Sequence, residues 1–352
     1  MTCGTQVSRK LIGKAFLLRD GALQVLRRTK TVRSMLALTF SSCHHTRDGY
    51  ASGGHPATIR NRFRRVTRTT SSLTIDRAFH PSRANTVNTF LTDILLGVIE
   101  GITEFLPISS TGHLLIAEHW LAPRSELFNV VIQAGAILAV TAIYWPRIWQ
   151  LLTGWREPAQ RDYLLKLFVA FLITSALGFI VVSVLKFKLA EALAPVAWAL
   201  LIGGVWMLIA ERLVADQPDR QAISWRVAIL VGLAQIVAGI FPGTSRSAAT
   251  IFIAMLAGTS NRAAATEFAF LVGIPTMYAA SAYELLKCYK AGALADENWS
   301  SVGVAFVVST ITAFIAVKWL LGYIRSHRFT AFAVYRIVLG AGLLMALATG
   351  IA

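Results

Sequence analysis

The sequence has few charged residues for its length and few cysteines. Asp, Glu, Lys and Arg together make up 15% of the 352 residues, whereas 55% are hydrophobic and the mean hydropathy is +0.58. This balance excludes an ordinary soluble domain and indicates a polytopic membrane protein. The three cysteines form neither a CxxC pair nor a regular framework, which excludes a disulfide-stapled module and a cysteine-based metal site.

Acidic residues are scarcest at the start of the chain. Residues 1–88 hold 16 of the 34 Lys and Arg but only three of the 18 acidic residues, whereas the remainder has 18 basic and 15 acidic residues. The basic excess therefore belongs to a tail without the pattern of a packed domain. This distribution argues against a nucleic-acid partner.

Six apolar windows approach the length of about 20 residues that a membrane crossing needs. They lie near 126–144, 163–186, 195–213, 264–285, 300–323 and 332–350. Two further apolar segments, about 90–121 and 225–257, are each interrupted by a proline and a cluster of Ser, Thr and Gly. Non-helical backbone at membrane depth survives only when it is buried in protein or lines a wet cavity, so we expect re-entrant helix–loop–helix hairpins.

The two interrupted segments resemble each other. Gly97–His113 reads GVIEGITEFLPISSTGH and Gly232–Ala248 reads GLAQIVAGIFPGTSRSA; a constant separation of 135 residues aligns their prolines and places Ser110 opposite Ser245. Three predicted crossings separate the copies, so the second enters from the opposite face and the tips meet near the midplane. The expected fold class is an all-α polytopic membrane protein, with six transmembrane helices and two re-entrant hairpins in an inverted internal repeat.

Loop charges predict the orientation. The loops of one side carry ten Lys and Arg and those of the other side five, which predicts that the first group is cytoplasmic. That group comprises the loops near 145–166, 212–226, 262 and 324–331. The first hairpin then enters the membrane from the outer side. The basic tail would also lie on the outer side, which the same rule disfavours.

The tail itself has three interpretations. Residues 1–87 are a disordered arm, a leader of the organelle-transit type, or sequence upstream of the true start. The charge rule favours the last of these, a start-site artefact with translation beginning near Val87. We expect the membrane-embedded domain to span residues 88–352.

Chemistry-bearing residues gather at the first interruption. Glu100 and Glu104 lie one helical turn apart and share a face. Charged groups inside membrane segments are expensive and are functional-site candidates by default. Ser109 and Ser110 stand where the cap of the next half-helix belongs, and His113 follows one turn later.

The second interruption has the features of an anion cradle. Thr244, Ser245, Arg246 and Ser247 stand at the start of a half-helix, where backbone N–H groups, the helix dipole and hydroxyls bind anions. Arg246 adds a planar fork that matches phosphate oxygens. A cap or a packing histidine would explain each feature alone. Their convergence on two related hairpins favours a site.

Other charged residues are expected to be structural. Glu118, His119 and Glu126 suit a hairpin exit at the membrane interface, and Glu211–Arg212 suits a cytoplasmic helix end. Glu267 is expected to cap a helix or to pair with Arg262.

Both motifs resemble a known family. EGITEFLPISSTGH (Glu100–His113) and PGTSRSAAT (Pro242–Thr250) are similar to the two signature motifs of the undecaprenyl-diphosphate phosphatases, the BacA/UppP or bacitracin resistance family. Residues 128–140 and 261–275 and the pair Tyr335-Arg336 look like further landmarks of that family. The resemblance covers about residues 88–352. Two positions depart from the pattern: Ala248 replaces a usual Gly and Ala269 a common Ser, and we expect effects on packing or rate.

The resemblance implies a reaction and a place. An undecaprenyl diphosphate lipid is hydrolysed to undecaprenyl phosphate and inorganic phosphate, which recycles the carrier for cell-wall synthesis and confers bacitracin resistance. The implied location is the bacterial inner membrane, with the site facing the periplasm. A homodimer is one option for the oligomeric state. No organic cofactor is expected, but Mg²⁺ or Ca²⁺ is, because hard cations bridge carboxylates and diphosphates; the sequence offers no all-protein metal cage.

Roles follow from this resemblance. Glu104 is expected to be the essential carboxylate, as general base or metal ligand, with Glu100 in support. Ser110 is the candidate nucleophile, with His113 as its base or as the acid for the leaving group; attack by water or by His113 stays open. Arg246 is expected to stabilise the transition-state charge. The expected substrate-binding residues are Ser109, Thr111, Gly243, Thr244, Ser245, Ser247 and Thr250.

Two other functions share some of these sequence features. A lipid-phosphate transporter would also use inverted repeats and half-helix N-termini, but it needs no nucleophile and base. A membrane phosphatase of the phosphatidic-acid phosphatase type would need a His soon after Ser245-Arg246. None occurs before His327, so that interpretation is weak.

Overall fold

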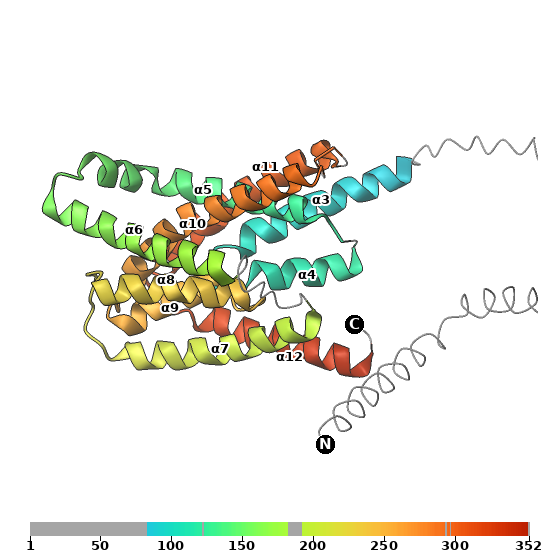
Figure 1. Cartoon of the computed structure of the whole chain (residues 1–352). Helices are drawn as coiled ribbons and strands as arrows, with labels where there is room; N and C mark the ends of the chain where they lie inside the picture. Colours follow the sequence, from blue (N-terminus) through green and yellow to red (C-terminus); the bar gives the residue numbers. More distant parts are fainter. Residues whose placement is uncertain (1–82, 122, 182–191, 293, 296, 351–352) are drawn as a thin grey trace, which may run out of the picture. The chain divides into compact units, whose positions relative to one another are not determined.

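A computed structural model describes residues 83–121, 123–181, 192–292, 294–295 and 297–350. Nearly all of the predicted basic tail therefore lies outside the described residues. The described residues all belong to one compact unit, His80–Ala352. Every regular element within them is a helix (Figure 1).

Six helices are long and apolar enough to cross a membrane. They are α5 (Glu126–Thr153), α6 (Pro158–Phe179), α7 (Leu193–Ala215), α10 (Arg262–Lys290), α11 (Trp299–Tyr323) and α12 (Thr330–Thr349). The six predicted crossings are confirmed, although the end of the second prediction, beyond residue 181, lies outside the described residues. Helix α5 ends well beyond the predicted boundary near 144, because the helix continues through Pro146 into a polar end that hydropathy does not detect.

Four other helices form two helix–turn–helix pairs. The first hairpin consists of α3 (Arg83–Thr103) and α4 (Ser110–Trp120), and the second of α8 (Trp225–Ile240) and α9 (Arg246–Ala257). Helices α4, α8 and α9 have 11, 16 and 12 residues. At 1.5 Å per residue they span about 16 to 24 Å, less than the roughly 30 Å of a hydrocarbon core. These lengths agree with the predicted re-entrant hairpins, whose entry and exit on one side stays a prediction.

Polar side chains cap the first turn of four helices. In each case the side chain of the capping residue accepts a hydrogen bond from a backbone N–H in the first turn, which satisfies a group that the helix leaves unpaired. The caps are Ser125 for α5, Ser224 for α8, Asn261 for α10 and Asn298 for α11.

Helices α7 and α12 cross with two-fold character. A Cβ added to Gly204 of α7 would lie 2.7 Å from the carbonyl oxygen of Ala333, and one added to Gly340 of α12 would lie 2.7 Å from that of Ala197. Both the glycines and the alanines are 136 residues apart in sequence. Each helix therefore presses its glycine against the same point of the other, as small residues allow in membrane proteins.

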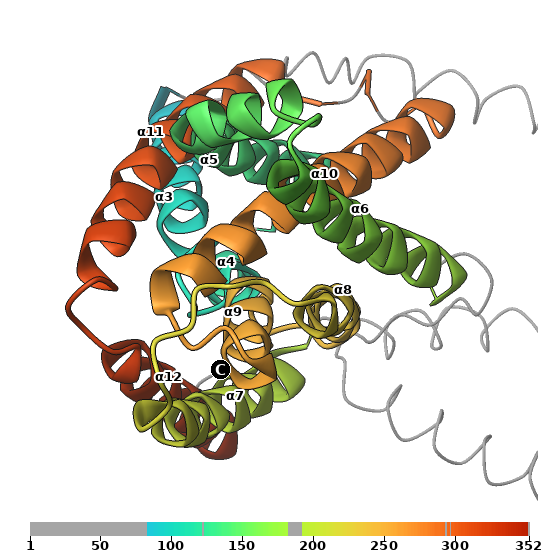
Figure 2. The same ribbon diagram turned by 90° about the vertical axis from the view of Figure 1, so that its left-hand side faces the viewer.

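Each hairpin also packs through a glycine against an alanine of another helix. Gly97 of α3 lies against Ala305 of α11, where a Cβ would come within 2.6 Å of the carbonyl oxygen, and Gly232 of α8 lies against Ala170 of α6, at 2.8 Å. Helix α3 runs beside α11 in both views (Figures 1 and 2). Each hairpin thus packs on a helix of the other half, which interleaves the halves and brings the hairpin tips together.

Candidate active site

Both hairpins turn through a strained serine. Ser109 has φ 79° and Ser245 has φ 69°, and they are the two non-glycine residues with positive φ in the described part of the chain. Each serine caps the following short helix, because its Oγ accepts from the N–H of Gly112 or Ala248 at 3.3 Å. Strained backbone of this kind persists where the surrounding structure enforces it, often at functional sites.

The two caps correct the predicted alignment of the tips. The structural counterparts are Ser109 and Ser245, 136 residues apart, so the predicted pairing of Ser110 with Ser245 was wrong. The second loop contains one more residue between its proline and its cap, and Gly243 in that loop has φ 91°, which glycine adopts without steric cost. The counterpart of Ser110 is therefore Arg246. The first residue of one short helix is a hydroxyl, and that of the other is a cation.

Ser110 is paired with a carboxylate. Its Oγ donates to Oε2 of Glu104, and both side chains are buried. The other carboxylate oxygen, Oε1, accepts from Nε2 of Gln133 at 3.5 Å. The backbone N–H of Glu104 still bonds to the carbonyl of Glu100 at 3.0 Å, so the two acids remain one turn apart although α3 ends at Thr103. Glu104 is placed to take the proton of the Ser110 hydroxyl.

Two buried polar groups near this pair have no protein partner. Oε2 of Glu100 and Nη1 of Arg246 are buried and accept or donate no hydrogen bond among the described residues. The charges of Glu104 and Arg246 both act on Glu100, which is 1% exposed. Unpartnered buried groups of opposite charge are costly unless a ligand satisfies them. The arrangement suits an anion on Arg246 and a cation or proton at Glu100.

Glu100 and Glu104 could bind a cation only together with ligands from outside the protein. No group of three or more His, Cys, Asp or Glu comes together within the described ranges. A hard cation takes six or more oxygen ligands, and Glu100 and Glu104 supply a few of them. The residues therefore fit a Mg²⁺ or Ca²⁺ ion that takes most of its ligands from a diphosphate and water.

The hairpin tips contact each other directly. The hydroxyl of Ser247 donates to the carbonyl oxygen of Leu106 at 3.0 Å, and the hydroxyls of Ser245 and Ser247 are 3.1 Å apart. The predicted meeting of the two tips is confirmed.

Arg336 of α12 holds the two tips and α7 together. Its side chain is 0% exposed, and each of its five hydrogen bonds to described residues ends on a carbonyl oxygen. It donates to Thr244 and Gly243 at 3.0 Å each, to Ala199 at 3.1 Å, and to Pro107 and Leu200 at 3.4 Å. Sequence reasoning noted this residue as a family landmark and gave it no role. A charge within a predicted crossing was the signal that marked it.

His113 is oriented by two partners. Its Nδ1 lies 2.6 Å from the carbonyl oxygen of Ser109, and a carbonyl only accepts, so Nδ1 carries the proton. Its Nε2 lies 2.7 Å from the hydroxyl of Tyr335, whose ring stacks on the imidazole at 5.6 Å. Neither ring nitrogen bonds to Ser110, whose partner is Glu104. Like Arg336, Gln133 and Tyr335 are site residues to which the sequence analysis assigned no role.

Residues 93–342 match the family model described as bacitracin resistance protein BacA. The chain belongs to this family. An undecaprenyl-diphosphatase of Rhizobium leguminosarum bv. trifolii is 70% identical over 262 residues, which are 74% of this chain and 98% of the relative. An undecaprenyl-diphosphatase of Xanthomonas euvesicatoria pv. vesicatoria is 62% identical over 252 residues, 72% of this chain and 95% of the relative. The resemblance to the BacA family is confirmed, and the matched region includes both tips and Arg336.

Two predicted binding residues of this BacA-family chain stand apart from the others. Thr111 is exposed at the start of α4. Thr250 is buried and donates to the carbonyl oxygens of Arg246 at 2.8 Å and Ser247 at 3.2 Å, within its own helix. Contacts of either residue with a substrate stay predictions.

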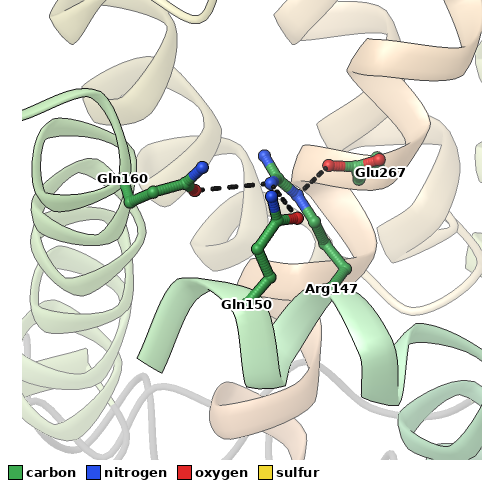
Figure 3. A network of polar contacts seen from close by, with 4 residues as sticks. All are labelled: Arg147, Gln150, Gln160 and Glu267. Carbon is green, nitrogen blue, oxygen red and sulfur yellow. Dashed lines mark hydrogen bonds and ion pairs between the residues drawn. The ribbon is translucent and has the colours of Figure 1, made fainter. Parts of the chain in front are cut away.

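The predicted pairing of Glu267 with Arg262 was wrong. Glu267 binds Arg147 at 3.0 Å, in a network with Gln150 and Gln160 that joins α5, α6 and α10 (Figure 3). Residues five apart on a helix point in different directions, which separates Glu267 from Arg262.

Arg262 instead forms a two-pronged pair with a buried acid. It donates to both oxygens of Glu211 at 3.1 and 2.6 Å, and Oε1 of Glu211 also accepts from the N–H of Phe329 at 2.9 Å. This arrangement ties α7, α10 and the start of α12 together. Glu211 lies in the last turns of α7, as predicted for a helix end, and its cytoplasmic side stays a prediction.

Proposed function

We propose that this BacA-family chain is an undecaprenyl-diphosphatase, which hydrolyses undecaprenyl diphosphate to undecaprenyl phosphate and inorganic phosphate. The reaction recycles the lipid carrier for cell-wall synthesis and confers bacitracin resistance. The names and near-complete coverage of the relatives support this activity. The observation that carries it is the buried pair of Ser110 and Glu104 beside a tip bearing Arg246.

The second tip binds the diphosphate. The start of α9 offers backbone N–H groups, the positive end of its dipole, and the hydroxyls of Ser245 and Ser247. Nη1 of Arg246, which has no hydrogen-bond partner in the described part of the chain, donates to a phosphate oxygen. In such a dry site these donors stabilise the charge that develops during phosphoryl transfer.

The first tip performs the chemistry. Oγ of Ser110 attacks the terminal phosphorus while its proton passes to Oε2 of Glu104, and the bond from that phosphorus to the bridging oxygen breaks. Glu104 returns the proton to the departing undecaprenyl phosphate. As a carboxylate again, it deprotonates the water that attacks the phosphoserine and then gives that proton to the departing Oγ of Ser110, which releases inorganic phosphate and restores the serine. If water attacks directly, Glu104 serves as the base for that water instead.

His113 and a cation assist. With its Nδ1 proton held by the carbonyl of Ser109, His113 is oriented to exchange a proton through Nε2 with the leaving group or with Tyr335. Glu100 and Glu104 would hold a Mg²⁺ or Ca²⁺ ion, which would neutralise part of the diphosphate charge.

Phosphate release from undecaprenyl diphosphate by the purified protein tests the proposal. We expect release by the wild type and a loss of about 10²- to 10³-fold in Arg246→Ala, the scale for a lost oxyanion donor. Arg147→Lys is the control, because Arg147 belongs to neither tip and binds Glu267 instead. Its rate of phosphate release should stay within about threefold of wild type. Binding of the lipid that depends on Arg246, without any release, would favour the transporter. Phosphate release that persists after divalent cations are chelated would contradict the proposed role of Mg²⁺ or Ca²⁺.

We also propose that the site faces the periplasm of the inner membrane. The loop-charge count supports this orientation and places the end of α10, with Cys288, on the outer side. In cells, a membrane-impermeant thiol reagent should label Cys288 in a protein carrying Cys3→Ser and Cys43→Ser. Labelling only after permeabilisation would reverse the orientation.

A further inference from the structure

An apolar groove ends at the second hairpin tip. It has a volume of about 610 Å³, and its walls are α7 and α8 and its floor α9. Trp198, Ile202 and Trp206 line the α7 side, Val237 and Phe241 the α8 side, and Ile253 the floor. The polar residues that line it are Thr244 and Arg336. An apolar channel therefore leads directly to the residues that surround the diphosphate cradle.

The internal repeat explains why this space is open. At the separation of 136 residues set by Ser109 and Ser245, the counterpart of Tyr335 is Ala199 and the counterpart of His113 is Ala249. At the first tip the two rings stack and fill the space. At the second tip two alanines line the groove instead. The part of the groove beside Ala199 and Ala249 thus corresponds to the place that a phenol and an imidazole occupy in the other half.

The groove walls also differ between the halves. The counterpart of Trp206 is Gly342 and that of Trp198 is Val334. At these two positions the large aromatic residue is on α7 and the small one on α12. Aromatic walls around a floor of Ala248, Ala249 and Ile253 suit a slender apolar ligand, and the volume is within the ~300–1,000 Å³ of typical ligand pockets.

We propose that this groove holds the first isoprenoid units of a polyprenyl diphosphate whose diphosphate lies on the Ser245–Ser247 cradle. The proposal rests on the proposed function. The twelve-residue run from Pro195 to Trp206 spans about 16 Å along α7, roughly half of a hydrocarbon core. A longer chain therefore leaves the groove and continues in the lipid.

A second apolar pocket does not offer the same path. It has a volume of about 390 Å³ between α5, α6 and α10, and it is lined by residues such as Leu151, Phe168 and Pro275, with none from either tip. Ordinary lipid chains suit that pocket. A chain attached to a diphosphate at the tips requires a path that begins there, and the α7–α8 groove does.

The groove acts through position more than through affinity. A prenyl chain in lipid is already out of water, so its entry into the groove gains no hydrophobic free energy. Van der Waals packing is the main favourable contribution. Holding the first units fixes the direction from which the diphosphate enters the cradle. Correct placement of the terminal phosphorus relative to Ser110 then raises the rate.

Filling the groove tests this proposal. Ala199→Tyr restores the phenol found in the other half, and Ile253→Trp raises the floor; Val338→Tyr, at a position 65% exposed on α12, is the matched control. We compare kcat/KM for undecaprenyl diphosphate with that for isopentenyl diphosphate, which carries one isoprenoid unit. The ratio should fall at least about fivefold in both filled variants and stay unchanged in the control. An unchanged ratio in both filled variants would overturn the proposal.

A labelling experiment separates the groove from the catalytic proposal. A farnesyl diphosphate analogue with a photoreactive terminal group should cross-link to α7 and α8 peptides of the wild-type protein, with loss of labelling when unlabelled undecaprenyl diphosphate competes. Labelling requires no turnover and no variant. Cross-links confined to α11 or to the α5–α6–α10 pocket would contradict the groove even if phosphate release is normal. Absent phosphate release with α7 and α8 labelled would contradict the function alone.

Discussion

The hydroxyl of Ser110 donates its hydrogen to Oε2 of Glu104, and both side chains are buried at the tip of the first hairpin. Ser110 is the first residue of α4, and Glu104 follows the last residue of α3. The short turn between them contains the strained cap Ser109. It therefore places the carboxylate of Glu104 against the hydroxyl of Ser110 before any substrate binds. Preorganisation of this kind avoids reorganisation during the reaction.

Arg246 should not be replaceable by lysine. An ammonium keeps the charge but loses the planar fork that binds two phosphate oxygens. We expect Arg246→Lys to lower kcat/KM for undecaprenyl diphosphate by at least about tenfold, with a smaller loss than in Arg246→Ala. Steady-state phosphate release measures both variants. Wild-type activity in Arg246→Lys would show that charge alone suffices.

Tyr335 should act by positioning His113. Tyr335→Phe keeps the stacked ring and removes one hydrogen bond, so kcat should fall about two- to tenfold with little change in KM. Tyr335→Ala should lose more because the stack is lost as well. The matched control is Tyr278→Phe, whose hydroxyl bonds to Thr141 at 3.3 Å. An equal loss in Tyr278→Phe would show that the effect is not specific to His113.

Arg336 should stabilise the meeting of the tips. Arg336→Met leaves buried carbonyl oxygens of both hairpins and α7 without their donor, at a cost of about 1–3 kcal/mol for each group left unsatisfied. Thermal unfolding in detergent should show a clearly lower midpoint, and activity should fall with it. Arg226→Met, at an exposed position, should change stability by no more than about 0.5 kcal/mol. A wild-type midpoint in Arg336→Met would refute this role.

The Arg147–Glu267 pair should contribute to stability and leave catalysis unchanged. The two side chains are 28% and 34% exposed, so their ion pair is worth about 1 kcal/mol or less. Glu267→Arg and Arg147→Glu should each lower the unfolding midpoint slightly, and the double exchange should restore part of the loss. Phosphate release should stay within about twofold of wild type. A tenfold loss of activity in a stably folded single variant would place the pair in the catalytic machinery.

Much of the fold was predictable because the length and hydropathy of a segment identify a membrane helix. The hairpins were predictable because Pro107 and Pro242 interrupt apolar helices at matching places. The ends of α5 and α10 were not, since their polar, tryptophan-rich or charged ends resemble loops to a hydropathy window.

The site was predictable in its members and less so in its pairings. The charges of Glu100, Glu104 and Arg246 inside apolar segments identified them. The partner of Ser110 could not be read from spacing, because His113 lies three residues away in sequence whereas Glu104 approaches through a turn. The alignment of the tips failed for a related reason: the extra residue near Gly243 shifts the backbone without changing the pattern of the flanking helices.

A double-mutant cycle on Ser110 and Glu104 tests the central claim most directly. Phosphate release from undecaprenyl diphosphate is measured for wild type, Ser110→Ala, Glu104→Gln and the double variant. If the two residues act as a unit, each single variant loses about 10²-fold or more and the double variant is no worse than the weaker single one. Independent losses that multiply in the double variant, or wild-type activity in Glu104→Gln, would contradict the account.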